Sequence, residues 1–184
     1  MQHIIRTALI SGLFAAWCCG TSAEPWKIDI NTNLGSALNT YSDNWTGGEA
    51  GSFTWAWQFL GIAERQLSPI LNTKTTLKMQ FGQTKIQNKL DKRWSAPQKS
   101  SDLIDAEELF RFTLGLWVDP FVSVRAISQF LDGSDPGNIR YVNPLDITEA
   151  AGVSRTLKKT DNLEWGSRLG AAARQFINRD TLNT

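Results

Sequence analysis

The chain has 184 residues, enough for one domain, and its 19 basic and 18 acidic residues almost cancel. A nearly neutral chain without a basic tract gives no reason to expect nucleic-acid binding. The only histidine, His3, and both cysteines, Cys18 and Cys19, lie among the first 23 residues. Residues 24–184 therefore contain no Ser-His-Asp triad, no cysteine nucleophile, no disulfide and no Cys/His metal site. We expect no enzyme, no metal and no cofactor. A Ser-Lys or carboxylate-pair hydrolase stays open, but no spacing indicates one.

The first 23 residues have the pattern of a cleaved secretory signal peptide. Met1–Arg6 is basic, Thr7–Gly20 is apolar, and small residues precede Glu24. The apolar run is about 14 residues, shorter than the roughly 20 that a membrane-spanning helix needs. An N-terminal anchor helix or a lipidated cysteine is the alternative. We expect export, followed by a single domain over residues 24–184.

Residues 51–61 carry the clearest signal in the sequence. Phe53, Trp55, Trp57 and Phe59 share one parity, whereas small and polar residues share the other. Alternation with a period of two predicts a β-strand whose faces meet different environments. Four aromatic side chains in a row on one face are typical of an outer-membrane strand whose rings contact lipid.

Similar segments, separated by turn-forming clusters, recur along the chain. The seven candidate strands cover residues 26–38, 51–63, 75–84, 107–118, 121–130, 147–157 and 164–177. Residues 88–101 and 131–138 are polar and contain proline, so we expect longer loops there, and a short turn at Asp119-Pro120. A helix over residues 102–109 is the alternative to a non-helical conformation there. Glu149 and Arg155 share the apolar parity of the sixth strand, which predicts a bulge or a mixed face.

The order of these elements predicts the fold class. No later stretch approaches 18 uninterrupted apolar residues, so only strands could cross a membrane. Short turns alternating with longer loops predict an all-β, antiparallel up-and-down transmembrane β-barrel, with about seven strands in this sequence. Bacterial single-chain barrels have an even number of strands, whereas seven is odd. Residues 178–184 resemble a turn rather than a final strand with a terminal aromatic residue. We expect a partial barrel that is incomplete at its C-terminus, or one that closes by oligomerising.

Three stretches resemble a family of uncharacterised bacterial outer-membrane proteins, classed as a domain of unknown function. They are Asn44-Trp-Thr-Gly-Gly48 with the aromatic strand after it, the strand 120–130, and the segment 143–152. The likeness covers most of residues 27–157 and rests on motifs that barrels share in part. The resemblance implies a porin-like barrel in the outer membrane and brings no catalytic residues with it.

The two parities assign candidate residues to the two faces of such a barrel. The predicted lipid-facing aromatics are Phe53, Trp55, Trp57, Phe59, Phe110 and Phe112. The predicted lumen-facing basic residues are Lys27, Lys78, Arg111, Arg125, Arg168 and Arg174. Asp29 is the only acid assigned to that parity, which predicts a lumen biased toward small anionic solutes. The alternative is that Asp102, Asp105 and Asp132 fold inward and neutralise these charges.

The sequence thus favours an outer-membrane protein with the lipid bilayer as its partner. Its role would be porin-like passive transport or a structural one. A secreted soluble β-sandwich that binds glycans or protein partners is the alternative, with the aromatic strand in its core or as a sugar-stacking platform. Cell fractionation separates these two hypotheses.

Overall fold

The computed structural model describes residues 24–42, 50–134, 137, 139–160 and 163–179, without the side chains of Lys159 and Glu164. The predicted signal peptide and the Asn44–Gly48 turn lie outside these residues. Within them, no helix is long and apolar enough to cross a membrane.

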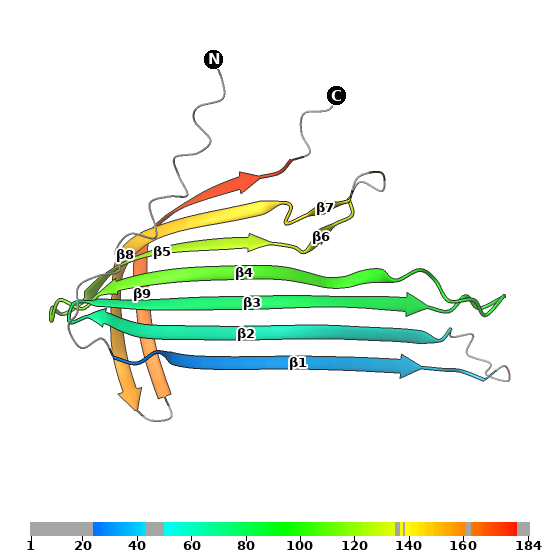
Figure 1. Ribbon diagram of the computed structural model, residues 1–184, viewed down its shortest axis with the longest axis horizontal. Helices are drawn as coiled ribbons and strands as arrows, with labels where there is room; N and C mark the ends of the chain where they lie inside the picture. Colours follow the sequence, from blue (N-terminus) through cyan, green and yellow to red (C-terminus); the bar gives the residue numbers. More distant parts are fainter. Residues whose placement is uncertain (1–23, 43–49, 135–136, 138, 161–162, 180–184) are drawn as a thin grey trace, which may run out of the picture.

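Seven strands form one antiparallel sheet in the order β1-β2-β3-β4-β5-β8-β9, so each strand lies next to its neighbours along the chain (Figure 1). They are β1 (Lys27–Asn39), β2 (Ser52–Ser68), β3 (Leu71–Ile86), β4 (Gln98–Phe112), β5 (Asp119–Ser128), β8 (Leu145–Thr160) and β9 (Leu163–Ile177). The short strands β6 (Leu131–Asp132) and β7 (Arg140–Tyr141) pair with each other in the β5–β8 connection. The predicted all-β, up-and-down architecture is confirmed.

The alternation seen in β2 continues into its neighbours through the register of the sheet. Trp57 lies opposite Leu34 of β1 and Phe81 of β3. Because directly opposed residues share a face, one face collects most of the aromatic side chains and the other collects most of the basic ones, with some apolar residues such as Leu60 among them. We name them the aromatic face, which includes Trp55, Trp57 and Phe110, and the charged face, which includes Lys78, Arg125 and Arg168.

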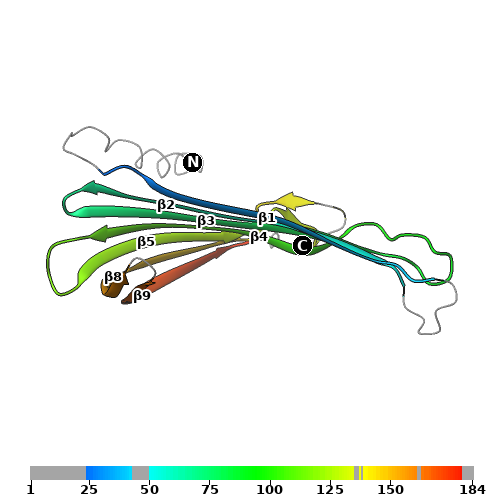
Figure 2. The same ribbon diagram turned by 90° about the horizontal axis from the view of Figure 1, so that it is seen from below.

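The sheet is curved, and the charged face lies on the inside of the curve. Figure 1 shows β8 and β9 turning away from the direction of β2–β4 in the halves nearest their shared turn, and Figure 2 shows a bent sheet rather than a flat one. Gly152 of β8 lies opposite Gly170 of β9. A Cβ added at Gly152 would lie 2.9 Å from the carbonyl carbon of Leu169, so this close approach requires glycine.

One prediction at β4 is wrong, and the alternative of a helix there is not adopted. Residues 98–101 belong to this strand rather than to a loop, and 102–109 are extended rather than helical. The strand ends at Phe112, so the tight connection to β5 is residues 113–118, and Asp119-Pro120 already lies within β5. The bulge predicted in the sixth strand is present as a register shift between Thr156 and Lys158.

β1 and β9 are the two edges of the sheet. Among the described residues each pairs on one side only, so the seven strands form an open sheet. Both edge strands run in the same direction, because six antiparallel pairings separate them. β1 is exposed along its whole length.

Candidate functional site on the charged face

The register places all six predicted lumen-facing basic residues on one face. Lys27 lies opposite Glu64, Lys78 opposite Asp105, and Arg111 opposite Asn72. Arg125 lies opposite Glu107 and Thr148, Arg168 opposite Ser154, and Arg174 opposite Thr148. Five strands therefore contribute basic groups to one polar surface. That this surface lines a lumen stays a prediction.

Acidic groups share this face, which corrects the expectation that Asp29 is its only acid. Asp105 accepts two hydrogen bonds from Arg125, Nε to Oδ1 and Nη2 to Oδ2, each 2.7 Å long. Arg174 forms a similar forked contact with Asp146, with Nε 2.8 Å from Oδ1. A planar guanidinium matches a carboxylate in this two-point geometry, which holds both side chains in place.

A third ion pair crosses the sheet. Nη1 of Arg168 on β9 donates to Oε1 of Glu107 on β4 at 3.1 Å, although β5 and β8 lie between these strands. The same guanidinium is 5.8 Å from the ring of Phe121 on β5. The register places Glu107 in the same row as Arg174, six residues along β9 from Arg168. In a flat sheet the two backbones would therefore lie about 14 Å apart across the strands and about 20 Å apart along them, beyond the reach of the two side chains. The contact follows from the inward curvature of the charged face.

In three arginine–carboxylate pairs of the charged face the arginine is the more accessible partner, whereas Arg111 and Glu64 are 25% and 30% exposed. The side chain of Asp105 is 7% exposed and that of Arg125 is 46% exposed. For Asp146 and Arg174 the fractions are 12% and 70%, and for Glu107 and Arg168 they are 27% and 47%. At these three pairs a solute approaching the face therefore meets the guanidinium group before the carboxylate.

By the alternative hypothesis, three acids enter the lumen and neutralise its basic residues. In the structure these three acids lie in three different parts of the fold. Only Asp105 neutralises a predicted lumen-facing residue. Asp102 lies opposite Phe81 on the aromatic face, where its carboxylate accepts the amides of Phe130 and Leu131 at 2.6 and 3.0 Å. Asp132 lies in β6, in the connection beyond the seven-stranded sheet.

The predicted lipid-facing aromatics all lie on the aromatic face, and ring contacts link some of them to neighbours. The centroids of Trp55 and Phe81 are 5.9 Å apart, and those of Phe81 and Phe130 are 6.0 Å apart in an edge-on contact. Large apolar side chains nearer the edges are open to solvent, with Leu34 71% and Leu169 77% exposed. Exposed apolar surfaces of this extent are typical of sites that contact another protein or a membrane.

Besides Asp102, two more carboxylates interrupt the aromatic face. Glu108 lies opposite Thr75, whose Oγ1 donates to Oε2 at 2.5 Å, and Thr73 donates to the other carboxylate oxygen. Glu149 lies in the same row, on the other side of Val124. Glu149 was recognised from the sequence, whereas Glu108 was not, although it shares the parity of Phe110 and Phe112. The strand register adds that its hydrogen-bond partners on this face come from β3.

A second polar cluster lies where the β5–β8 connection meets the end of β9. Asn143, 1% exposed, donates to Asp132 at 2.6 Å and to Asn178 at 3.2 Å, and accepts the amide of Arg179 at 3.1 Å. The hydrogen bond from Asn143, followed by those from Ser134, lowers the pKa of Asp132 to about 2. This cluster ties the connection to the sheet, and its satisfied hydrogen bonds are sufficient to explain it.

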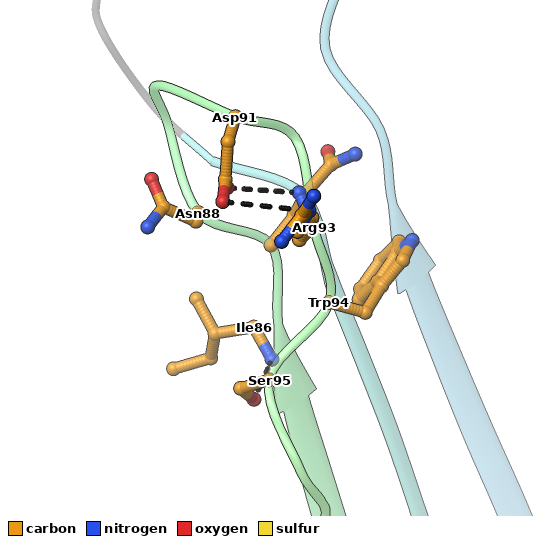
Figure 3. Close-up of a pocket in the computed structure, with 7 residues that line it drawn as sticks. Ile86, Asn88, Asp91, Arg93, Trp94 and Ser95 are labelled. Carbon is orange, nitrogen blue, oxygen red and sulfur yellow. Dashed lines mark hydrogen bonds and ion pairs between the residues drawn. The ribbon is translucent and has the colours of Figure 1, made fainter.

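The β3–β4 connection contains an open depression (Figure 3). Its lining includes Asn88 and Asp91, whose side chains accept the amides of Leu90 and Arg93 at 2.8 and 3.1 Å. These hydrogen bonds stabilise local turns. Arg93 and Asp91 lie side by side at 3.8 Å. The polar groups serve the loop itself, so the charged face is the stronger candidate site.

Comparisons with known proteins add no assignment. No protein family model, curated protein or solved structure matches the chain. Among the described residues no three His, Cys, Asp or Glu side chains are grouped so as to hold a metal ion. The two faces of the sheet therefore remain the features of this chain that bear on its function.

Proposed function

We propose that this chain forms part of the wall of a bacterial outer-membrane β-barrel, reached by export through a cleaved signal peptide. The aromatic face contacts lipid, and the charged face lines an aqueous lumen through which small anionic solutes pass. A purely structural role in the membrane is the runner-up. The observation that carries the proposal is the Arg168–Glu107 contact, since it requires the charged face to be concave and the aromatic face convex.

The dimensions of the apolar surface agree with this proposal. On β2 the aromatic face runs from Phe53, opposite Lys85, to Arg65. At about 3.3 Å per residue this stretch is about 40 Å long. A strand tilt of about 40° converts it to about 30 Å of height, enough for the apolar band of about 25 Å found in outer-membrane barrels.

A soluble β-sandwich would require a second sheet packed on the aromatic face. The described residues provide only the β6–β7 ribbon besides the main sheet. Trp165 and Leu34 are 60% and 71% exposed, so no such layer covers them. No observation favours the sandwich.

Membrane fractionation of cells that express the full chain tests the proposal. We expect the protein in the outer-membrane fraction, resistant to extraction by urea and alkaline carbonate and soluble in detergent. Recovery from the periplasm or the medium without detergent would overturn it. A known periplasmic protein and a known outer-membrane porin, followed in the same cells, validate the fractions.

A further inference from the structure

Three tryptophans gather at one end of the sheet. Trp26 immediately precedes β1, Trp117 lies in the β4–β5 turn, and Trp165 lies close to the β8–β9 turn. This is the end at which the β2–β3, β4–β5 and β8–β9 turns are located (Figure 1). The three side chains are 43%, 76% and 60% exposed, respectively. Three segments far apart in the sequence thus each carry an exposed tryptophan at this end of the sheet.

A basic side chain accompanies each of these tryptophans. The guanidinium carbon of Arg65 is 5.6 Å from the ring centroid of Trp26, and that of Arg155 is 4.1 Å from the ring centroid of Trp117. Lys158 lies directly opposite Trp165 in the β8–β9 register. A cation above an aromatic ring is attracted to the negative face of the ring, which orients the guanidinium.

These arginines differ from the arginines of the charged face. Arg111, Arg125, Arg168 and Arg174 each lie within 4.0 Å of a carboxylate. Arg65 and Arg155 lie on the aromatic face, opposite Thr73 and Ser167, and no carboxylate among the described residues is within 4.0 Å of either. Arg65 donates its Nε to the backbone oxygen of Glu24 at 3.0 Å. The terminal nitrogens of both arginines remain available to an anion.

We propose that the Trp26–Arg65 and Trp117–Arg155 pairs bind the phosphates of anionic phospholipid headgroups at this end of the sheet. This inference rests on the proposed function, since it takes the aromatic face to contact lipid. Tryptophan is enriched where the apolar region of a membrane meets its headgroups, and a guanidinium held above the ring lies at the level of the phosphates. Its planar edge binds phosphate through two parallel hydrogen bonds.

The test compares vesicles of phosphatidylcholine alone with vesicles that also contain phosphatidylglycerol. Full-length protein is refolded into both, and the bound fraction is measured by flotation and by tryptophan fluorescence. We expect insertion into both vesicles and tighter binding to the anionic ones. Replacing Arg65 and Arg155 by Gln should reduce the anionic preference by about fivefold per arginine, while insertion into phosphatidylcholine is retained. R65K/R155K, which keeps both charges but loses the planar guanidinium, should retain only part of the preference.

Arg93→Gln is the matched control. Arg93 lies in the β3–β4 connection, at the opposite end of the sheet, and is 87% exposed. This variant should bind both vesicles as the original protein does. An anionic preference that persists in R65Q/R155Q, or an original protein that shows none, would overturn the lipid site but leave the proposed function standing. Failure to float with either vesicle, or release from anionic vesicles by about 0.5 M salt, would overturn both proposals.

Discussion

Arg168 and Glu107 form an ion pair across the concave side of the sheet, from its edge strand β9 to its central strand β4. Neighbouring strands are already joined by backbone hydrogen bonds, whereas this contact passes over β5 and β8. It therefore depends on the curvature of the sheet, which makes it a direct probe of that curvature.

Removing this ion pair should lower the free energy of unfolding by a small but measurable amount. We expect a double-mutant cycle of Glu107→Gln and Arg168→Gln, followed by urea unfolding in detergent, to give a coupling of about 0.5–1 kcal/mol, because both side chains are partly exposed. The same cycle at Asp91 and Arg93, 3.8 Å apart and far more exposed, should give a coupling near zero. Equal values for the two pairs would contradict the cross-sheet contact.

Asp105 and Arg125 should affect ion selectivity in opposite directions. If the charged face lines a pore, Asp105→Asn leaves the exposed guanidinium without its carboxylate, so the preference for anions should rise. Arg125→Gln leaves the carboxylate, so the preference should fall. Reversal potentials across planar bilayers under a salt gradient measure both. A shift of the same sign in the two variants would show that the charged face does not line the conducting path.

The lipid contact of the aromatic face can be separated from its packing. Leu34 is 71% exposed in the sheet, so Leu34→Arg costs little if water covers this face. If lipid covers it, an arginine near the middle of the bilayer costs about 2–4 kcal/mol of folding free energy. Asn33→Arg, one residue earlier and on the charged face, is the matched control. Equal stability of the two variants in lipid vesicles would argue against the assigned orientation.

Gly152 and Gly170 should tolerate no side chain. A Cβ at either position overlaps the backbone of the opposite strand, lying 2.9 Å from the carbonyl carbon of Leu169 or 3.0 Å from that of Ala151. Gly152→Ala should cost about 1–3 kcal/mol in urea unfolding. Gly35→Ala, which has no heavy atom within 4 Å of the added Cβ, should change stability by less than about 0.5 kcal/mol.

The Asp132–Asn143 cluster should be sensitive to acid. The pKa of Asp132 falls from its ordinary value of 3.8 to about 2 in the folded protein, chiefly through the hydrogen bond from Asn143. The charged carboxylate therefore stabilises the fold fully above about pH 4, and this contribution disappears as the pH falls through about 2. The difference in Tm between the original protein and Asp132→Asn should be present at pH 5 and should shrink toward pH 2. A constant difference would show that the pKa of Asp132 is not lowered.

The strands that were predicted well are those whose two faces differ. In β2 and β9 apolar and polar side chains alternate, because each face meets one environment. The central strand β4 escaped prediction between residues 98 and 106. It carries carboxylates on both faces, Asp105 and Glu107 on one, Asp102 and Glu108 on the other, so alternation is lost. Partners from other strands satisfy these carboxylates, which no local pattern reveals.

The amino-acid sequence alone determined that the chain forms an antiparallel sheet with an aromatic and a charged face, because side chains alternate along an extended strand whatever its neighbours are. Only the tertiary structure decided which acids lie beneath which arginines and that the charged face is concave. Those properties depend on register and on curvature, which bring Arg168 to Glu107 and Arg155 to Trp117. Pairing between distant segments is a property of the assembled sheet, and the periodicity of one strand carries no information about it.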